Sequence, residues 1–247
     1  IKVVYTPLNG SGKKCVVRIM EKLGIKDIEI VPEQSEPDGN FPTCPYPNPE
    51  FKEALQKGIE LSEKVSPDVL LATDPDCDRV GIAVNKDGEY ILLSGNEVGV
   101  LMLDYISKMK KENDQMPENP VAVTTIVSSD MVDPVAEEHG VEIKRVLTGF
   151  KYIGDIIADL EKEGKEDSFL LGYEESYGYL TGGYVRDKDA VNASMIICEM
   201  VSYYKEKGKT LYDAMADLYG KYGYYINETC NFTFEGEDGM IKMDNIM

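Results

Sequence analysis

Runs of apolar residues, separated by hydroxyl-rich turns and polar helical stretches, recur in the same order twice along the chain. The first series predicts a strand at 3–5, a helix near 13–23 and a strand at 28–31. The second series predicts a strand at 121–126, a helix near 131–138 and a strand at 141–143. Strand, turn, helix, strand is the plan of a βαβ-type unit. Its recurrence predicts an α/β fold with two tandem related domains, each a mixed sheet flanked by helices.

The rest of the sequence predicts further helices and a boundary between the two domains. Helical spacing of apolar residues predicts further helices near 50–64, 97–110 and 191–207. Thr210 and Asp213 have the spacing of a capping box that opens another helix. Residues 85–95 are rich in turn residues, and we expect the boundary between the two domains there.

Three carboxylates occupy alternate positions between two apolar, β-type runs. They are Asp74, Asp76 and Asp78, and Arg79 follows at once. In an extended or tightly turned loop, residues i, i+2 and i+4 can point to one side. Ionised there, they would repel by roughly 3 kcal/mol per pair at ~5 Å and an effective dielectric of ~20. Oxygen ligands suit a hard divalent cation, and the loop therefore predicts a site for Mg²⁺ before Ca²⁺ or Mn²⁺.

Other interpretations of this loop fit the amino-acid sequence less well. An EF-hand loop starting at Asp74 would need Gly at its sixth position and Glu at its twelfth, which hold Arg79 and Asn85. A phosphatase with an aspartyl nucleophile would continue into a loop and a helix, whereas residues 80–84 predict a second strand. The acids are thus expected at the tip of a hairpin. A solvated acidic turn is common for two acids and improbable for three with an adjoining arginine.

The charge balance narrows the possible partners. Acidic residues number 45 against 26 basic ones, which gives a formal net charge of −19. Such a chain is poorly suited to nucleic acid or to anionic membrane surfaces, where binding depends on neutralising phosphate. An anionic small substrate remains compatible if metal and positive charge are concentrated at one site.

The cysteines and the ends of the chain indicate context. The five cysteines are odd in number and lack Cys-x-x-Cys spacing, so we expect reduced thiols in a cytoplasmic protein. They are Cys15, Cys44, Cys77, Cys198 and Cys230. No run approaches the length of a membrane span. Because the chain opens inside a predicted strand without an initiator Met, we expect an excised piece of a longer protein.

A second candidate loop follows the buried-type strand near 169–173. Glu174 and Ser176 lie in a loop bracketed by Gly172 and Gly178. Carboxylates at the carboxyl end of a strand are well placed to accept hydrogen bonds from ligand hydroxyls, such as the vicinal diol of a sugar. An exposed turn explains the same sequence equally well, and residue spacing alone does not distinguish a ligand-binding loop from such a turn.

Weaker signals favour ordinary structural roles on composition alone. Residues 148–151 are typical of a turn with a snorkelling lysine, and Asp189 can cap the next helix and leave Lys188 solvated. The loop at 9–12 offers backbone amides at a helix start, which suits phosphate. A dinucleotide fingerprint would place its third glycine at Cys15, so NAD binding is not expected. His139 is expected to be a surface helix cap.

Taken together, these residues resemble the α-D-phosphohexomutases, and in particular the bacterial phosphoglucomutase/phosphomannomutase branch. The matching strings follow the family order and cover nearly the whole chain. They are residues 6–10, 41–42, 47–50, 74–79, 148–151, 172–178 and 186–189. The triple-Asp-Arg loop and the Glu-Glu-Ser loop are the specific elements.

The resemblance implies a domain assignment. Family members are four-domain enzymes, of which this chain would be the second domain at 1–93, the third at 94–222 and a connector at 223–247 toward a fourth. The first domain, which carries the phosphoserine loop, and the fourth, which grips the substrate phosphate, would be missing. No Ser-His-Asn-Pro string of the family kind occurs in the chain.

The resemblance also implies a mechanism, an intramolecular phosphoryl transfer between hexose 1-phosphate and 6-phosphate through a bisphosphate. It assigns the Mg²⁺ ligands to Asp74, Asp76 and Asp78. It assigns contact with the phosphoryl group or substrate to Arg79, and proton handling near the reacting hydroxyl to Lys188. The substrate-binding positions it implies are Thr148, Gly149, Glu174 and Ser176.

Departures from the family pattern leave alternatives open. Asn9 stands where many relatives have His, Tyr177 where many have Gly, and Cys77 replaces a smaller residue. The choice between gluco and manno sugars stays open. We expect a fragment that is inactive by itself. The alternatives are a non-catalytic sugar-phosphate or cation-binding module, and a metal-dependent phosphatase with Asp74 as nucleophile.

Overall fold

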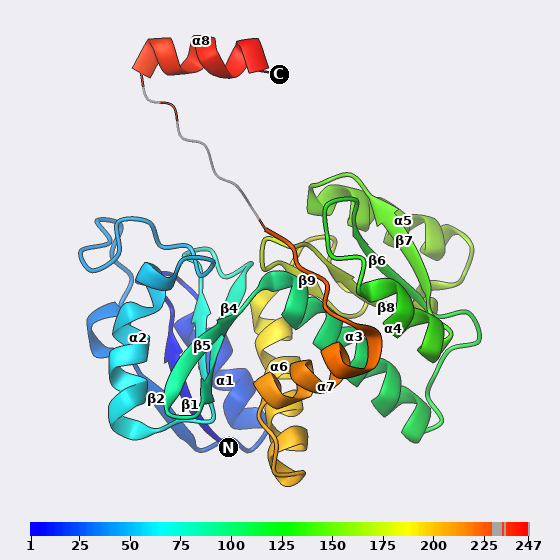
Figure 1. Cartoon of the computed structure of the whole chain (residues 1–247), viewed down its shortest axis with the longest axis horizontal. Helices are drawn as coiled ribbons and strands as arrows, with labels where there is room; N and C mark the ends of the chain where they lie inside the picture. Colours follow the sequence, from blue (N-terminus) through cyan, green and yellow to red (C-terminus); the bar gives the residue numbers. More distant parts are fainter. Residues whose placement is uncertain (229–233, 235, 247) are drawn as a thin grey trace.

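The computed structural model describes residues 1–228, 234 and 236–246, and it shows two α/β units side by side (Figure 1). The first sheet has the strand order β2-β1-β3-β4-β5 and the second β7-β6-β8-β9. The strands of the first sheet are β1 (Lys2–Thr6), β2 (Asp27–Ile30), β3 (Val69–Thr73), β4 (Val80–Lys86) and β5 (Glu89–Leu93). Those of the second are β6 (Val121–Thr125), β7 (Glu142–Val146), β8 (Phe169–Tyr173) and β9 (Tyr179–Leu180).

The two sheets share one topology. In the first, β1 pairs in parallel with β2 and β3, and β4 returns antiparallel to β3. In the second, β6 pairs in parallel with β7 and β8, and β9 returns antiparallel to β8. The prediction of two related tandem α/β domains with mixed sheets is confirmed. As a consequence, the β3–β4 loop and the β8–β9 loop occupy equivalent positions in their domains.

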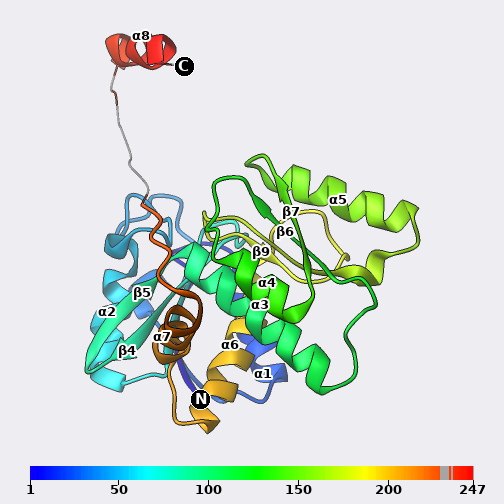
Figure 2. The same ribbon diagram turned by 45° about the vertical axis from the view of Figure 1, so that its right-hand side comes forward.

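Helices cover both faces of each sheet (Figures 1 and 2). Helix α2 packs on one face of the first sheet through Leu55 and Ile59, and α5 on one face of the second through Ile153 and Ile157. The helices are α1 (Lys13–Lys22), α2 (Lys52–Val65), α3 (Gly95–Glu112), α4 (Val132–His139), α5 (Phe150–Lys162), α6 (Ala190–Glu206), α7 (Leu211–Tyr222) and α8 (Gly236–Ile246). The described residues also include two 3-10 turns, η1 (Pro32–Gln34) and η2 (Glu166–Ser168).

Helix α6 joins the two units, although it follows the second sheet in sequence. It packs against α1 and against β3 and β4 of the first sheet, and also against α3 and β9. One core cluster therefore contains Leu71 and Ile82 of the first sheet, Tyr173 of the second and Ile197 of α6. Polar contacts at the same boundary include Lys205 Nζ to Asp68 Oδ2 at 2.8 Å. The apolar core thus fixes how the domains sit relative to each other.

One local prediction is wrong, and one description needs refinement. The domain boundary expected within 85–95 stays a prediction, but that stretch is not all turn: it holds the end of β4 and strand β5, with Asp87 and Gly88, at φ of 52° and 95°, in the turn between them. Residues 148–151 do not form a simple turn, since Phe150 opens helix α5. The apolar residues of α5 recur at helical spacing and bury one face against the second sheet, a signal present in the sequence. The capping box of Thr210 and Asp213 is confirmed.

The cysteines agree with the expectation where they can be compared. Cys15, Cys44, Cys77 and Cys198 are free thiols, and Cys230 lies outside the described residues. Within the described ranges, none of the helices combines the length and the apolar character that a bilayer crossing requires.

The joint core generates a stability prediction. Replacing fully buried Ile197 with Ala should destabilise the chain by about 2–5 kcal/mol, because it removes apolar contacts and leaves a cavity. Both domains should still unfold in one calorimetric transition, with hydrogen exchange accelerated in β3 as well as in β8.

The matched control is Ile226→Ala, a side chain that is 89% exposed, which should change stability by less than about 0.5 kcal/mol. Two separate transitions, of which Ile197→Ala shifts only the one from the second domain, would show that the domains do not share a core.

Candidate metal centre and adjoining loops

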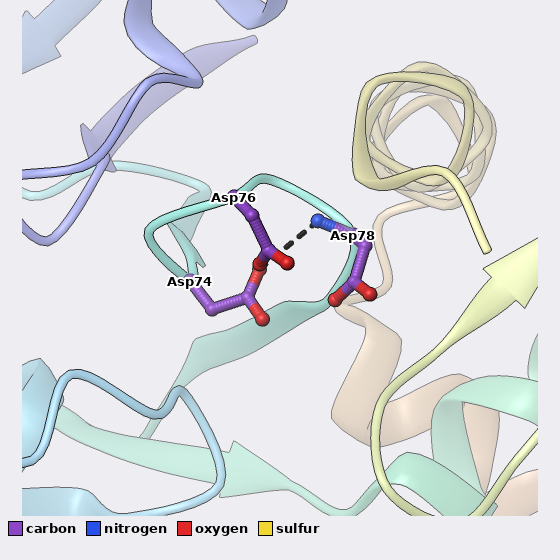
Figure 3. A group of neighbouring side chains, drawn as sticks. All are labelled: Asp74, Asp76 and Asp78. Atoms are coloured by element: carbon purple, nitrogen blue, oxygen red, sulfur yellow. Dashed lines mark hydrogen bonds between the residues drawn. The ribbon is translucent and has the colours of Figure 1, made fainter. Parts of the chain in front are cut away.

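The β3–β4 loop gathers the three aspartates around one point (Figure 3). Asp74, Asp76 and Asp78 each offer a carboxylate oxygen, and these oxygens lie within 4.8 Å of one another. Asp74 Oδ1 accepts hydrogen bonds from the backbone N–H groups of Asp78 at 3.0 Å and Arg79 at 2.9 Å. The loop therefore curls around the first carboxylate, and the other two side chains reach the same space.

The β1–α1 loop supports this curl from behind. Ser11 N–H donates to the carbonyl of Pro75 at 2.8 Å, and a side chain at Gly10 would meet the backbone of Pro75 at 2.3 Å. A side chain at Gly12 would meet Cys77 Sγ at 2.8 Å. Cys77 itself has a left-handed backbone, with φ of 62°, at the turn of the loop. Close backbone approach, which glycine permits, thus fixes the acidic loop on the first domain.

The electrostatics of the loop favour a bound cation. Burial, with help from the carboxylates of Asp78 and Asp76, raises the pKa of Asp74 to about 7 against the backbone hydrogen bond from Arg79. Asp78 Oδ1 is buried and has no hydrogen-bond partner. A buried acceptor without a partner is costly, and a metal ion would satisfy it. Three carboxylates with one free buried oxygen therefore fit a hard divalent cation.

Two cationic side chains offset part of the acidic charge. Arg79 Nε lies 3.8 Å from both Asp74 Oδ2 and Asp78 Oδ1, and its Nη1 donates to Glu50 Oε1 at 3.0 Å. Lys188 Nζ lies 2.7 Å from Asp78 Oδ2. Because Lys188 precedes α6, the second domain supplies a counter-charge to a loop of the first.

Backbone contacts join the two equivalent loops directly. Arg79 and Gly178 form an antiparallel bridge, and Val80 N–H donates to the carbonyl of Tyr177 at 3.1 Å. Ala190 N–H, at the start of α6, donates to the carbonyl of Cys77 at 3.2 Å. The acidic loop and the β8–β9 loop therefore form one continuous surface, although about a hundred residues separate them in sequence.

Glu174 is the buried acid of the β8–β9 loop, with 6% of its surface exposed. Its Oε1 accepts a hydrogen bond from Gly149 N–H at 2.7 Å. Burial raises the pKa of Glu174 above its ordinary value, against that hydrogen bond. The contact ties the predicted substrate turn at 148–149 to the Glu-Glu-Ser loop. It leaves the second carboxylate oxygen without a partner among the described side-chain hydrogen bonds.

Glu175 turns the other way and anchors the loop. Its Oε2 accepts hydrogen bonds from Thr125 Oγ1 at 2.7 Å, at the end of β6, and from Ser128 Oγ at 3.3 Å, in the loop that follows. Its carbonyl lies over the first turn of α3, where a side chain at Gly95 would meet it at 2.1 Å. Contacts with the first turn of α3, with the end of β6 and with the β6–α4 loop therefore hold the β8–β9 loop in place.

The remaining predicted residues lie on these same loops. Ser176 is half-buried and Thr148 is exposed, and neither takes part in a described side-chain hydrogen bond.

His139 is not a surface cap, because its side chain is only 10% exposed and its Nε2 lies 2.9 Å from Asp104 Oδ1. That contact joins α4 to α3, far from the acidic loop in sequence, and the expectation of a solvent-facing role is wrong.

Sequence reasoning missed the supporting residues of the site. Glu50 forms an ion pair with Arg79, and Glu175 anchors the β8–β9 loop. Both lie inside the sequence strings that resemble the family, and that resemblance could have marked them as site residues. Thr125, Ser128 and Gly95 had no comparable signal, since their role depends on elements brought together only by folding.

Comparison with known families identifies both halves of the chain. The model described as phosphoglucomutase/phosphomannomutase, alpha/beta/alpha domain II, matches residues 1–88. The corresponding model of domain III matches residues 94–222.

Curated relatives extend over the whole chain. It is 36% identical over 248 residues to a phosphoglucomutase of Staphylococcus epidermidis, and 35% identical to one of Staphylococcus aureus. Each alignment covers 100% of this chain and 44% of the relative, so the chain spans less than half the length of these relatives.

Solved structures share the fold. A phosphoglucomutase/phosphomannomutase family protein from Burkholderia thailandensis superposes with a TM-score of 0.68 at 19% identity, over 88% of this chain and 42% of that one. The open form of parafusin, a phosphoglucomutase from Paramecium, gives 0.66 at 16% identity, over 91% and 38%. At these identities the likeness concerns the fold alone.

The packing under the β8–β9 loop predicts the effect of one added methyl group. Gly95→Ala should destabilise the chain by about 1–3 kcal/mol, because the backbone of Glu175 must move to admit the new carbon. Thermal unfolding measures the loss.

Gly39→Ala is the matched control, since a side chain there would meet nothing within 4 Å, and its stability should stay within about 0.5 kcal/mol of the parent. Equal stability of the two variants would contradict the close approach.

Proposed function

The chain belongs to the phosphoglucomutase/phosphomannomutase family, and from that premise we propose that it supplies the metal-binding and sugar-binding domains of a phosphohexomutase. The reaction is an intramolecular phosphoryl transfer that interconverts hexose 1-phosphate and 6-phosphate through a bisphosphate. One observation carries the proposal: the Arg79–Gly178 bridge unites the triple-Asp loop and the Glu-Glu-Ser loop in one surface. A metal site and a hydroxyl-binding site side by side are what this transfer requires.

The metal in this proposal is Mg²⁺, and Asp74, Asp76 and Asp78 would hold it. A bound Mg²⁺ supplies charge neutralisation for phosphoryl oxygens during transfer. The chain provides a loop whose first carboxylate is oriented by two backbone N–H groups. Because the oxygens already lie close together, little conformational entropy is lost when a cation binds.

Arg79 would contact the transferred phosphoryl group. Its guanidinium is held at one end by Glu50 and at the other by the acidic loop. Its Nε is buried with no hydrogen-bond partner. A planar guanidinium held in this way is pre-organised for phosphate oxygens. Glu50 therefore serves in the proposal as the residue that positions Arg79.

Glu174 and Ser176 would bind sugar hydroxyls. Gly149 N–H occupies one carboxylate oxygen of Glu174 and orients the other, which can accept from neighbouring hydroxyls of the sugar. Thr148 and Gly149 would contribute the turn that borders the same ligand. Lys188 would lie near the reacting hydroxyl, where its ammonium can move or stabilise a proton.

The domain limits belong to the proposal too: a second domain at 1–93, a third at 94–222 and a connector at 223–247. The chain spans 44% of its curated relatives, which supports a parent enzyme with further domains. By this proposal the isolated chain is inactive, and the cytoplasmic location indicated by the cysteines stays a prediction. A phosphatase with Asp74 as nucleophile is less well supported, because Asp74 is 8% exposed and already accepts two hydrogen bonds.

Metal binding should depend on the aspartates. Asp74→Asn keeps an oxygen for the two backbone hydrogen bonds but removes a negative charge, and Asp78→Asn removes the buried free oxygen's charge. Each should weaken Mg²⁺ binding by about tenfold or more, measured by isothermal titration calorimetry.

Asp87→Asn is the matched control, with the same charge change in the exposed β4–β5 turn, and should bind Mg²⁺ like the parent. Equal affinity in all three variants would exclude the triad as the site.

The isolated chain should not interconvert glucose 1-phosphate and glucose 6-phosphate. The expected result is no product above background in an assay coupled to glucose 6-phosphate dehydrogenase, with saturating Mg²⁺ and added glucose 1,6-bisphosphate. The physical reason is that the implied phosphoserine is supplied by another domain. Substantial turnover by the purified chain would contradict this part of the proposal.

A further inference from the structure

Lys188 is the side chain through which the second domain reaches the acidic loop of the first. It lies in the segment between β9 and α6, and its ammonium contacts Asp78 Oδ2 at 2.7 Å and Asp187 Oδ1 at 3.2 Å. Its side chain is 15% exposed. Few conformations are therefore open to it, and the contact with Asp78 is its closest.

The surroundings of Lys188 restrict it further. Its stem runs across Gly178, where an added side chain would meet Lys188 Cδ at 2.4 Å. Its ammonium lies 5.9 Å from the centre of the Phe150 ring. Next in sequence, Asp189 N–H donates to the carbonyl of Tyr179, and Asp189 caps α6 through Val191 N–H. Backbone and stem together aim the ammonium at Asp78.

The two oxygens of Asp78 have different surroundings. Oδ2 pairs with Lys188, whereas Oδ1 is buried, without a hydrogen-bond partner, and 3.8 Å from Arg79 Nε. The carboxylate oxygens of the three aspartates lie within 4.8 Å of one another. A cation held by the triad and the ammonium of Lys188 would therefore share the carboxylate of Asp78.

We propose that Lys188 is a positioning residue that sets the affinity of the Asp74–Asp76–Asp78 loop for its divalent cation. It orients Asp78 and at the same time places a positive charge close to the cation. Lys188 Nζ lies 2.7 Å from a carboxylate that would ligate the cation, so two positive charges would share Asp78 in a partly buried loop, where repulsion is less screened than in water. In this proposal the repulsion outweighs the benefit of orientation. Lys188 therefore weakens cation binding. The inference rests on the proposed function, since it assumes that the triad is the metal site.

The inference predicts that removing the charge strengthens binding. With the full chain, isothermal titration with MgCl₂ should show Lys188→Met binding about tenfold more tightly than the parent, equivalent to about 1.4 kcal/mol. Lys188→Arg, which keeps the charge, should stay within about threefold of the parent. A residue needed only to hold the structure would give the opposite sign, because its loss would weaken binding.

Lys205→Met is the matched control. Lys205 also reaches from α6 to an aspartate of the first domain, Asp68, at 2.8 Å, but at the other end of strand β3. Its loss removes the same kind of ion pair between domains and should leave Mg²⁺ affinity unchanged. Lys188→Gln provides a second neutral variant should Lys188→Met fail to fold, as judged by circular dichroism.

The outcomes separate the two proposals. A parent chain that binds no Mg²⁺, or binds it equally well after Asp74→Asn and after Asp78→Asn, would overturn the metal site itself. A parent chain that binds at the triad, with unchanged or weaker binding in both neutral Lys188 variants, would overturn the inference and leave the metal site standing. Equal tightening by Lys188→Met and Lys205→Met would also overturn it, since the effect would then follow net charge alone.

Discussion

The placement of α6 in a core shared by both domains is the constraint on which the rest of the structure depends. The helix follows the second sheet in sequence, yet it packs on α1 and on the strands β3 and β4 that lead into and out of the acidic loop. Burial of Ile197 and its neighbours makes this arrangement favourable through the hydrophobic effect. The first residue of the same helix, Ala190, is hydrogen-bonded to Cys77 of that loop. Core packing and site geometry are therefore one feature.

The related topology of the two domains explains how distinct chemistries come to face each other. In each domain, the loop after the third parallel strand leads into an antiparallel return strand. The first domain places three aspartates in this loop and the second places Glu174 and Glu175 there. Since the loops are equivalent and the domains pack side by side, the antiparallel bridge at Arg79 and Gly178 joins them. The three clustered aspartates and the buried carboxylate of Glu174 then border the same surface.

Charge compensation across the domain boundary makes so acidic a surface tolerable. In a chain of net charge −19, two of the few cationic groups near the loop are Arg79 and Lys188. Each is held by a further acid, Glu50 or Asp187, so that neither charge is free to move far. Such fixed charges act on a ligand without reorganisation, which is the general condition for efficient electrostatic stabilisation.

The sequence by itself determined the features that depend on neighbours in the chain. Strand and helix periodicity predicted the two βαβ units, and alternate aspartates between apolar runs predicted a hairpin tip with three clustered carboxylates, because side-chain direction follows local backbone geometry. Tertiary structure alone decided which distant groups meet. These contacts join residues that are tens to more than a hundred positions apart in sequence. They are Glu50 with Arg79, Lys188 with Asp78, Gly95 with Glu175 and His139 with Asp104. No local pattern encodes such contacts, since they arise only when the elements that carry them have packed together, and Lys188 meets Asp78 only when the two domains have done so.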